Sequence, residues 1–167
     1  MLLTISTSHA PATDLGFLLH KNPARPQAVE VSGGTAHVFY PEAGEERCTV
    51  ALLLEVDPIA LVRGSRGNEA FNLGQYVNDR PYAASSLLAV ALGKAFASAR
   101  RGVSKERPEL AASPIPLEVH LPALSCRGGA GMAAQFFAPL GWRVDARQVP
   151  LDPRFPEWGD SATSTCG

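Results

Sequence analysis

The chain has 167 residues and a mass of 17.7 kDa, which is the size of one ordinary domain and excludes a complete (β/α)₈ barrel. Fifteen basic and 16 acidic residues leave a formal charge of -1, so the molecule as a whole does not attract nucleic acid or an anionic membrane. Three widely spaced cysteines outside any C-x-x-C pair exclude a disulfide framework and a zinc site, and they fit a reducing cytosol.

The amino-terminal part of the sequence predicts a strand and a short helix. Residues 2–7 alternate apolar and small polar side chains, as a strand does. Thr13 is a suitable cap for a helix that carries Leu15, Leu18 and Leu19 on one face. No apolar run approaches the roughly 18 residues of a membrane span, and no signal peptide precedes the first strand. We therefore expect a cytoplasmic protein with no membrane association.

Three further strands and a loop follow. Two β-favouring runs, 28–32 and 35–40, flank a glycine pair and predict a hairpin. Residues 48–56 are nearly continuously apolar, which is typical of a central strand covered on both faces. Glycine, proline and charged residues between 57 and 75 predict an exposed loop.

The second half predicts two more helices and two more strands. Ser85 or Ser86 could cap a central buried helix that runs to Arg101 and is apolar around most of its circumference. The remaining elements are expected at 115–121 (strand), 131–137 (helix) and 142–149 (strand).

The order of these elements predicts an α+β fold in a single domain. We expect a mixed, mostly antiparallel sheet of about six strands with about three helices. This domain should span residues 1–160. Residues 161–167 are small and polar, and their composition predicts a disordered tail.

One predicted loop, just before the central helix, is denser in hydrogen-bonding side chains than a connection needs. An arginine there can grip a phosphate or carboxylate with two hydrogen bonds, and a tyrosine can stack on a base or pack against a partner. A simple turn with a local ion pair is the alternative interpretation. The candidate contact residues are Tyr76, Asn78, Asp79, Arg80 and Tyr82.

Four cations within eight residues form the strongest positive cluster of the sequence. They are Arg100, Arg101, Lys105 and Arg107. Such a cluster can contact RNA phosphates, although charge runs at helix ends are often simply solvated.

A glycine-rich turn joins a predicted strand to a predicted helix at residues 126–132. Its backbone N–H groups, with Arg127, Gly128 and Gly129, form a possible anion site. The segment matches neither of the two common phosphate-loop patterns, so an ordinary strand-to-helix turn remains the alternative.

No catalytic, cofactor-binding or metal-binding residue is predicted in this chain. No nucleophile motif is present, and Glu118 and His120, which share one predicted strand face, lack a third metal ligand. The residue chemistry alone leaves three functions open: a protein-binding domain, a small RNA-binding module, or a compact enzyme that binds a phosphorylated metabolite at the glycine-rich turn.

Six segments, taken together in this order, resemble one family, the bacterial Hen-type 3′-terminal RNA ribose 2′-O-methyltransferases, over their amino-terminal region. The segments are Met1–Leu19, Ala36–Cys48, Tyr76–Ser86, Lys105–Ala111, Cys126–Gly129 and Leu151–Ser161. The resemblance implies a role in RNA repair, in which this region binds a bacterial polynucleotide kinase-phosphatase-ligase and supports its ligase activity.

The same resemblance implies that catalysis belongs to a different domain. The family uses S-adenosylmethionine and a divalent metal in a methyltransferase domain, and no segment of these 167 residues matches that domain. No catalytic residue is carried over, and we expect the chain alone to be inactive as a methyltransferase. We therefore expect a non-catalytic partner-binding domain.

Overall fold

The computed structural model describes residues 1–31, 33–57, 83–126 and 128–167. This part of the chain holds seven strands, short helices and a mostly antiparallel pairing, which confirms the predicted α+β class. It divides into two compact units, one with Met1 and Leu3–Glu118 and one with Leu2 and Val119–Gly167.

The first unit is built on a sheet in the order β2-β3-β4-β1. Its strands are β1 (Leu2–Thr7), β2 (Gln27–Val31), β3 (Gly34–Ala43) and β4 (Cys48–Val56). The strands β2, β3 and β4 form an antiparallel meander, and paired hydrogen bonds between Met1 and Leu54, of 2.7 and 2.8 Å, align β1 against β4. The predictions for β1 and β4 are confirmed at both ends.

A glycine is required where β3 begins. A Cβ at Gly34 would collide with the backbone carbonyl oxygen of Glu55 on β4. Only glycine therefore lets the two strands approach this closely at the start of their ladder, which extends from Gly34 paired with Val56 to Ala43 paired with Cys48.

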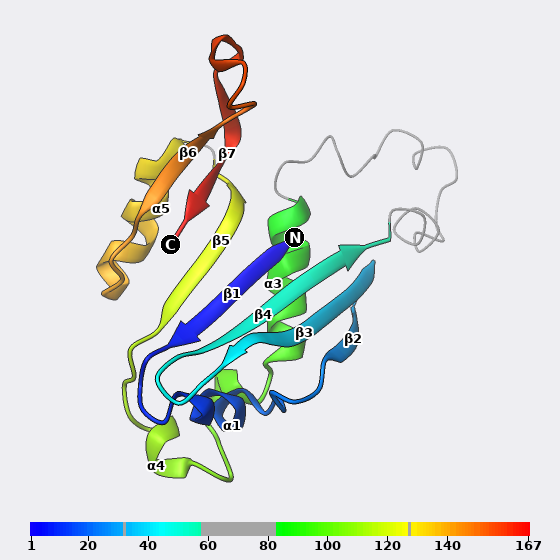
Figure 1. Cartoon of the computed structure of the whole chain (residues 1–167), viewed down its shortest axis with the longest axis vertical. Coiled ribbons are helices and arrows are strands. Elements are labelled where there is room, and N and C mark those ends of the chain that lie inside the picture. The colour runs from blue at the N-terminus through cyan, green and yellow to red at the C-terminus, as the bar shows by residue number, and fades with distance from the viewer. Residues whose placement is uncertain (32, 58–82, 127) are drawn as a thin grey trace. The chain divides into compact units, whose positions relative to one another are not determined.

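The helix α3 (Ala83–Ala95) packs on one face of this sheet and closes the core (Figure 1). Leu88, Ala91, Ala95 and Phe96 are buried on the side toward the sheet, whereas Val90 is 53% exposed. The strand β4 supplies Val50, Leu52 and Leu54 to the same core, but Leu53 on its other face is 40% exposed. The predictions of a central buried helix and of a strand covered on both faces therefore hold only in part. Val90 of α3 is exposed, and on the face of β4 away from this core Ala51 is 1% exposed whereas Leu53 is not buried.

The boundaries of α3 also differ from the prediction. The helix already includes Ser85 and Ser86, so neither residue caps it. It ends at Ala95, and the 3₁₀ turn Ala99–Arg101 follows before Gly102, whose φ of 66° is left-handed and stops the turn.

Two short helices stand at one end of this unit, α1 (Leu15–Leu19) and α4 (Pro108–Ala111) (Figure 1). A 3₁₀ turn, Ala12–Asp14, leads into α1, so the N-cap position falls on Asp14 without a side-chain cap, and Thr13 is not the cap. His20 ends α1 with a left-handed φ of 54°.

The second unit holds the strand order β5-β7-β6 and one helix. Its elements are β5 (Glu118–Ser125), α5 (Gly129–Phe137), β6 (Ala146–Pro150) and β7 (Asp160–Cys166). The helix α5 packs on β6 and β7. Residues 161–167 were predicted to be a disordered tail, and that prediction was wrong, because Cys166 pairs with Leu121 on one side and with Ala146 on the other.

Candidate functional site

The predicted cation cluster separates into one residue with an ion-pair partner and three with none among the described residues. Arg107 is the anchor: its Nε donates a 2.9 Å hydrogen bond to Oδ2 of Asp14, which is 8% exposed, and its guanidinium carbon lies 4.8 Å from the centroid of the Phe17 ring. The hydrogen bond and the charge of Asp14 raise the pKa of Arg107 above its ordinary value. Arg107 therefore ties its own segment to α1.

Two further contacts hold the residues just before Arg107 against α1. The buried Ser104 donates from Oγ to the carbonyl oxygen of Phe17 at 3.3 Å and accepts a 3.2 Å hydrogen bond from the Arg107 backbone N–H. The ring Nε2 of His20 lies 2.8 Å from the carbonyl oxygen of Val103. Residues 103–107 are thus fixed in place by side chains and backbone of α1.

The other three cations face solvent. Arg100, Arg101 and Lys105 are exposed, and among the described residues no acidic side chain lies within the 4.0 Å of an ion pair from any of them. We call these three residues the basic surface. Two apolar side chains of the same region are also exposed, Phe17 at 43% and Val103 at 58%.

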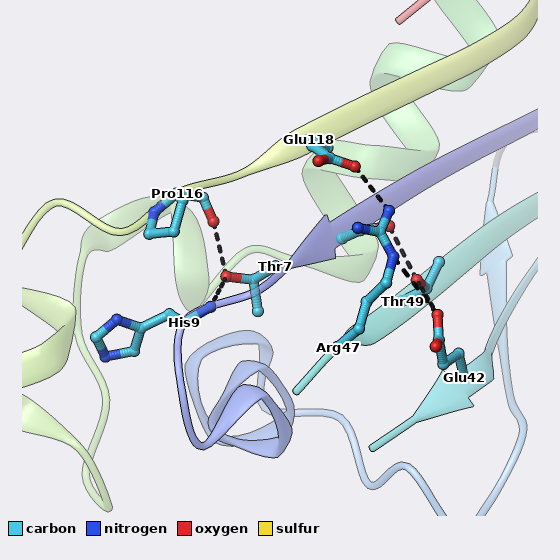
Figure 2. A network of polar contacts seen from close by, with 8 residues as sticks. Thr7, His9, Glu42, Arg47, Thr49, Pro116 and Glu118 are labelled. Atoms are coloured by element: carbon cyan, nitrogen blue, oxygen red, sulfur yellow. Dashed lines mark hydrogen bonds and ion pairs between the residues drawn. The ribbon is translucent and has the colours of Figure 1, made fainter. Parts of the chain in front are cut away.

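A polar network joins the start of β5 to the β3–β4 hairpin within the first unit (Figure 2). Arg47 donates from Nη2 to Oε2 of Glu118 at 2.7 Å, and its Nε lies 3.6 Å from Oε2 of Glu42. The hydrogen bond to Glu118 raises the pKa of Arg47 above its ordinary value. This arrangement engages Glu118 in an ion pair.

The network continues through hydroxyl groups along β1. Thr7, which is buried, donates from Oγ1 to the carbonyl oxygen of Pro116 at 2.7 Å, and Thr7 Oγ1 itself accepts a 3.2 Å hydrogen bond from the His9 backbone N–H (Figure 2). The hydroxyls of Ser6 and Thr49 are 2.9 Å apart. These contacts tie β1 to β4 and to the residues just before β5.

The glycine-rich turn has the strand-to-helix form that the sequence predicted. Gly128 and Gly129 have left-handed φ values of 102° and 72°, and the Gly129 N–H donates to the carbonyl oxygen of Cys126 at 3.1 Å. Arg127 lies outside the described residues. The anion site at this turn remains a prediction.

The predicted contact loop and the question of a metal site remain to be placed on the structure. Tyr76, Asn78, Asp79, Arg80 and Tyr82 all lie outside the described residues, so their contact role remains a prediction. Within the described chain there is no group of three or more His, Cys, Asp or Glu side chains that could hold a metal ion.

The nine-residue turn between β6 and β7 is a further feature, for which the sequence predicted no role. We call residues 151–159 the aromatic tip (Figure 1, orange). The Leu151 N–H donates to the carbonyl oxygen of Gly159 at 3.0 Å and closes the turn. Within it, the rings of Phe155 and Trp158 stack with centroids 4.6 Å apart and planes 14° apart.

The aromatic tip keeps its large side chains in solvent. Trp158 is 59% exposed, Leu151 60% and Phe155 40%. Asp152 accepts a 2.8 Å hydrogen bond from the Arg154 backbone N–H, and the Arg154 guanidinium carbon lies 5.9 Å from the Phe155 ring centroid. Two aromatic residues three positions apart in a proline-rich turn were a sequence signal for this feature.

The comparisons with known proteins now decide the family. The model of the "RNA repair, ligase-Pnkp-associating, region of Hen1" matches residues 1–166, nearly the whole chain. The chain belongs to this family. A search of curated proteins finds no match to it. None of the helices in the described ranges is long and apolar enough to cross a membrane.

Proposed function

We propose that this chain is a non-catalytic domain that binds a bacterial polynucleotide kinase-phosphatase-ligase and supports its sealing of RNA. The family is described by its association with ligase-Pnkp in RNA repair, which makes a protein partner of this class the first candidate. The observation that carries the proposal is the aromatic tip, an exposed and internally ordered group of the side chains that protein interfaces favour.

Exposed aromatic side chains are typical of protein-binding surfaces. Tryptophan, tyrosine and arginine dominate the binding energy of protein interfaces, where they fill pockets from which water is excluded. Trp158 and Phe155 are already stacked, and Arg154 is held near them by Asp152, so little conformational freedom is lost on binding. The tip therefore suits a protein partner.

The predicted loop with Arg80 and Tyr82, which lies outside the described residues, is a second proposed contact. Its composition supports this role, since arginine and tyrosine are enriched in interfaces. Arg80→Ala and Tyr82→Ala should weaken partner binding while circular dichroism and melting temperature stay unchanged. Unfolding of the domain by either substitution would instead identify this loop as a structural latch.

The binding function is tested with the full chain and a purified polynucleotide kinase-phosphatase-ligase of the same bacterial origin. The two proteins should co-elute in size-exclusion chromatography with light scattering, and adding the chain should raise the rate of sealing of a nicked RNA by the ligase. Separate elution at micromolar concentrations together with an unchanged sealing rate would contradict the proposal.

The non-catalytic part of the proposal needs its own assay. The chain, incubated with S-adenosylmethionine, Mn²⁺ or Mg²⁺ and an RNA with a free 3′ end, should transfer no methyl group to the terminal ribose. Methyl transfer that scales with the concentration of this chain would show that it is an enzyme.

A further inference from the structure

The basic surface brings three cations within six residues of the chain, although the acidic Glu106 follows directly. The formal charge of the whole chain is -1, yet Arg100, Arg101 and Lys105 stand together without a described acidic partner in ion-pair range. Asp14 forms its ion pair with Arg107, not with a cation of the basic surface. Cations without an ion-pair partner among the described residues favour local attraction of an anion on a nearly neutral protein.

The backbone that carries these cations is held before any ligand arrives: Arg100 and Arg101 lie in the 3₁₀ turn Ala99–Arg101, and Lys105 lies within residues 103–107. The Arg107–Asp14 ion pair, the two hydrogen bonds of Ser104 and the contact between His20 and Val103 fix residues 103–107 on α1. A fixed segment loses little freedom when it binds, so its charges act at a lower entropic cost than those of a loose tail.

An aromatic ring belongs to the same region. The ring of Phe17 is 43% exposed and is packed against the guanidinium of Arg107, which keeps it in one orientation. Cations that follow a phosphate backbone together with an exposed aromatic ring on which a base can stack are the two components of single-strand binding sites.

We propose that the basic surface binds the phosphate backbone of single-stranded RNA, with Phe17 beside a base. This RNA-binding function goes beyond the proposed contact with the ligase and does not depend on it, because the residues belong to a different unit from the aromatic tip. The site would place RNA on the first unit while the tip remains available to a protein.

The test measures the binding of a fluorescein-labelled 20-nucleotide oligouridylate to the full chain by fluorescence anisotropy between 50 and 200 mM salt. We compare the wild type with the double variant Arg101→Gln, Lys105→Gln. Each lost phosphate contact removes about 0.7 from the slope of log K against log salt, so the double variant should have a slope shallower by about 1.4 and at least about tenfold weaker binding at low salt.

A matched variant controls for net charge. Arg143→Gln, Arg147→Gln removes the same formal charge from exposed positions of the second unit and should leave both the affinity and the salt slope at the wild-type values. Phe17→Leu, which keeps an apolar group over Arg107, should weaken binding without changing the slope, because stacking does not displace counterions.

Three results would overturn the RNA proposal. The first is no binding of the wild type to the oligouridylate at micromolar concentration in 50 mM salt. The second is an equal loss in the two double variants, which would show a general effect of net charge. The third is a double variant at positions 101 and 105 that loses affinity for the ligase and keeps its affinity for RNA, which would make this surface a protein contact.

Discussion

The two units of this protein distribute their apolar side chains in opposite ways. In the first unit Leu52, Val38 and Phe96 are at most 3% exposed and lie between a four-stranded sheet and α3. In the second unit Ala133 and Cys166 are the buried residues of the described chain, while Phe136 and Leu140 are 66% and 72% exposed.

This difference separates the residues that hold the fold from those available to a partner. Burial of apolar surface is the main force that offsets the entropy of ordering a chain, and the first unit has a core of its own. Large apolar side chains that stay in water contribute little to the free energy of folding. When a partner covers them, the burial of their apolar surface contributes to the free energy of binding instead. The second unit therefore has the surface that suits protein binding.

The largest expected effect is the loss of a core side chain of the first unit. Phe96→Ala should lower the free energy of unfolding by about 3 to 5 kcal/mol, because it removes a ring that is 3% exposed and leaves a cavity. Leu151→Ala in the aromatic tip, where the side chain is 60% exposed, should change it by less than about 0.5 kcal/mol. Urea unfolding followed by circular dichroism measures both. Equal losses would remove the contrast between the units.

The next effect separates the anchoring arginine from the exposed ones. Arg107→Ala should lower the melting temperature, since it leaves the buried carboxylate of Asp14 without its partner. Arg101→Ala, which removes a side chain with no ion-pair partner among the described residues, should leave it unchanged. Differential scanning fluorimetry compares the two variants directly. A loss of stability in Arg101→Ala as large as in Arg107→Ala would contradict the assigned roles.

The smallest effect is a difference in the reactivity of the cysteines. Burial and the nearby Glu42 raise the pKa of the Cys48 thiol, and burial and Asp145 raise that of Cys166. At pH 8 these two thiols should be less ionised than an ordinary thiol and less accessible, so iodoacetamide should modify the partly exposed Cys126 first. Peptide mass spectrometry over time gives the order. Modification of Cys48 before Cys126 would show that the core of the first unit opens readily.

The effect of pH on these thiols has a defined sign. Because the folded pKa values of Cys48 and Cys166 lie above the ordinary value of a thiol, their contribution to stability is complete below the pKa of the unfolded chain. That contribution is lost as the pH rises through the folded values, so the protein should become less stable in the alkaline range. Stability that increases above pH 9 would contradict the burial of these groups.

Much of the fold could be predicted from the sequence where one local pattern is decisive. The alternation in residues 2–7 and the apolar run in 48–56 specified β1 and β4 at both ends. The pairing of strands far apart in the chain could not be predicted from the sequence. The strand β7 forms from small polar residues because β5 and β6 supply its hydrogen-bond partners. The boundaries of α3 were missed because several serines and alanines at its start are equally compatible with a cap or a helix interior.

The candidate site was predictable in composition but not in arrangement. The cation cluster was found from its charges, yet only tertiary contacts distinguish Arg107, which is paired with Asp14 from 93 positions earlier in the chain, from Arg101 and Lys105. The residues of the aromatic tip carry part of the family resemblance, but no contact role was predicted for them. Its stacked rings depend on the closure of the turn between Leu151 and Gly159, which residue types alone do not reveal.

The central claim is that the second unit, through the aromatic tip, contacts the ligase partner while the first unit holds the fold. Isothermal titration of the polynucleotide kinase-phosphatase-ligase with the full chain tests it, with Trp158→Ala compared against wild type. Truncating an interface tryptophan costs about 2 kcal/mol or more, so Trp158→Ala should bind about thirtyfold more weakly while its melting temperature stays at the wild-type value. Wild-type affinity in Trp158→Ala would contradict the account.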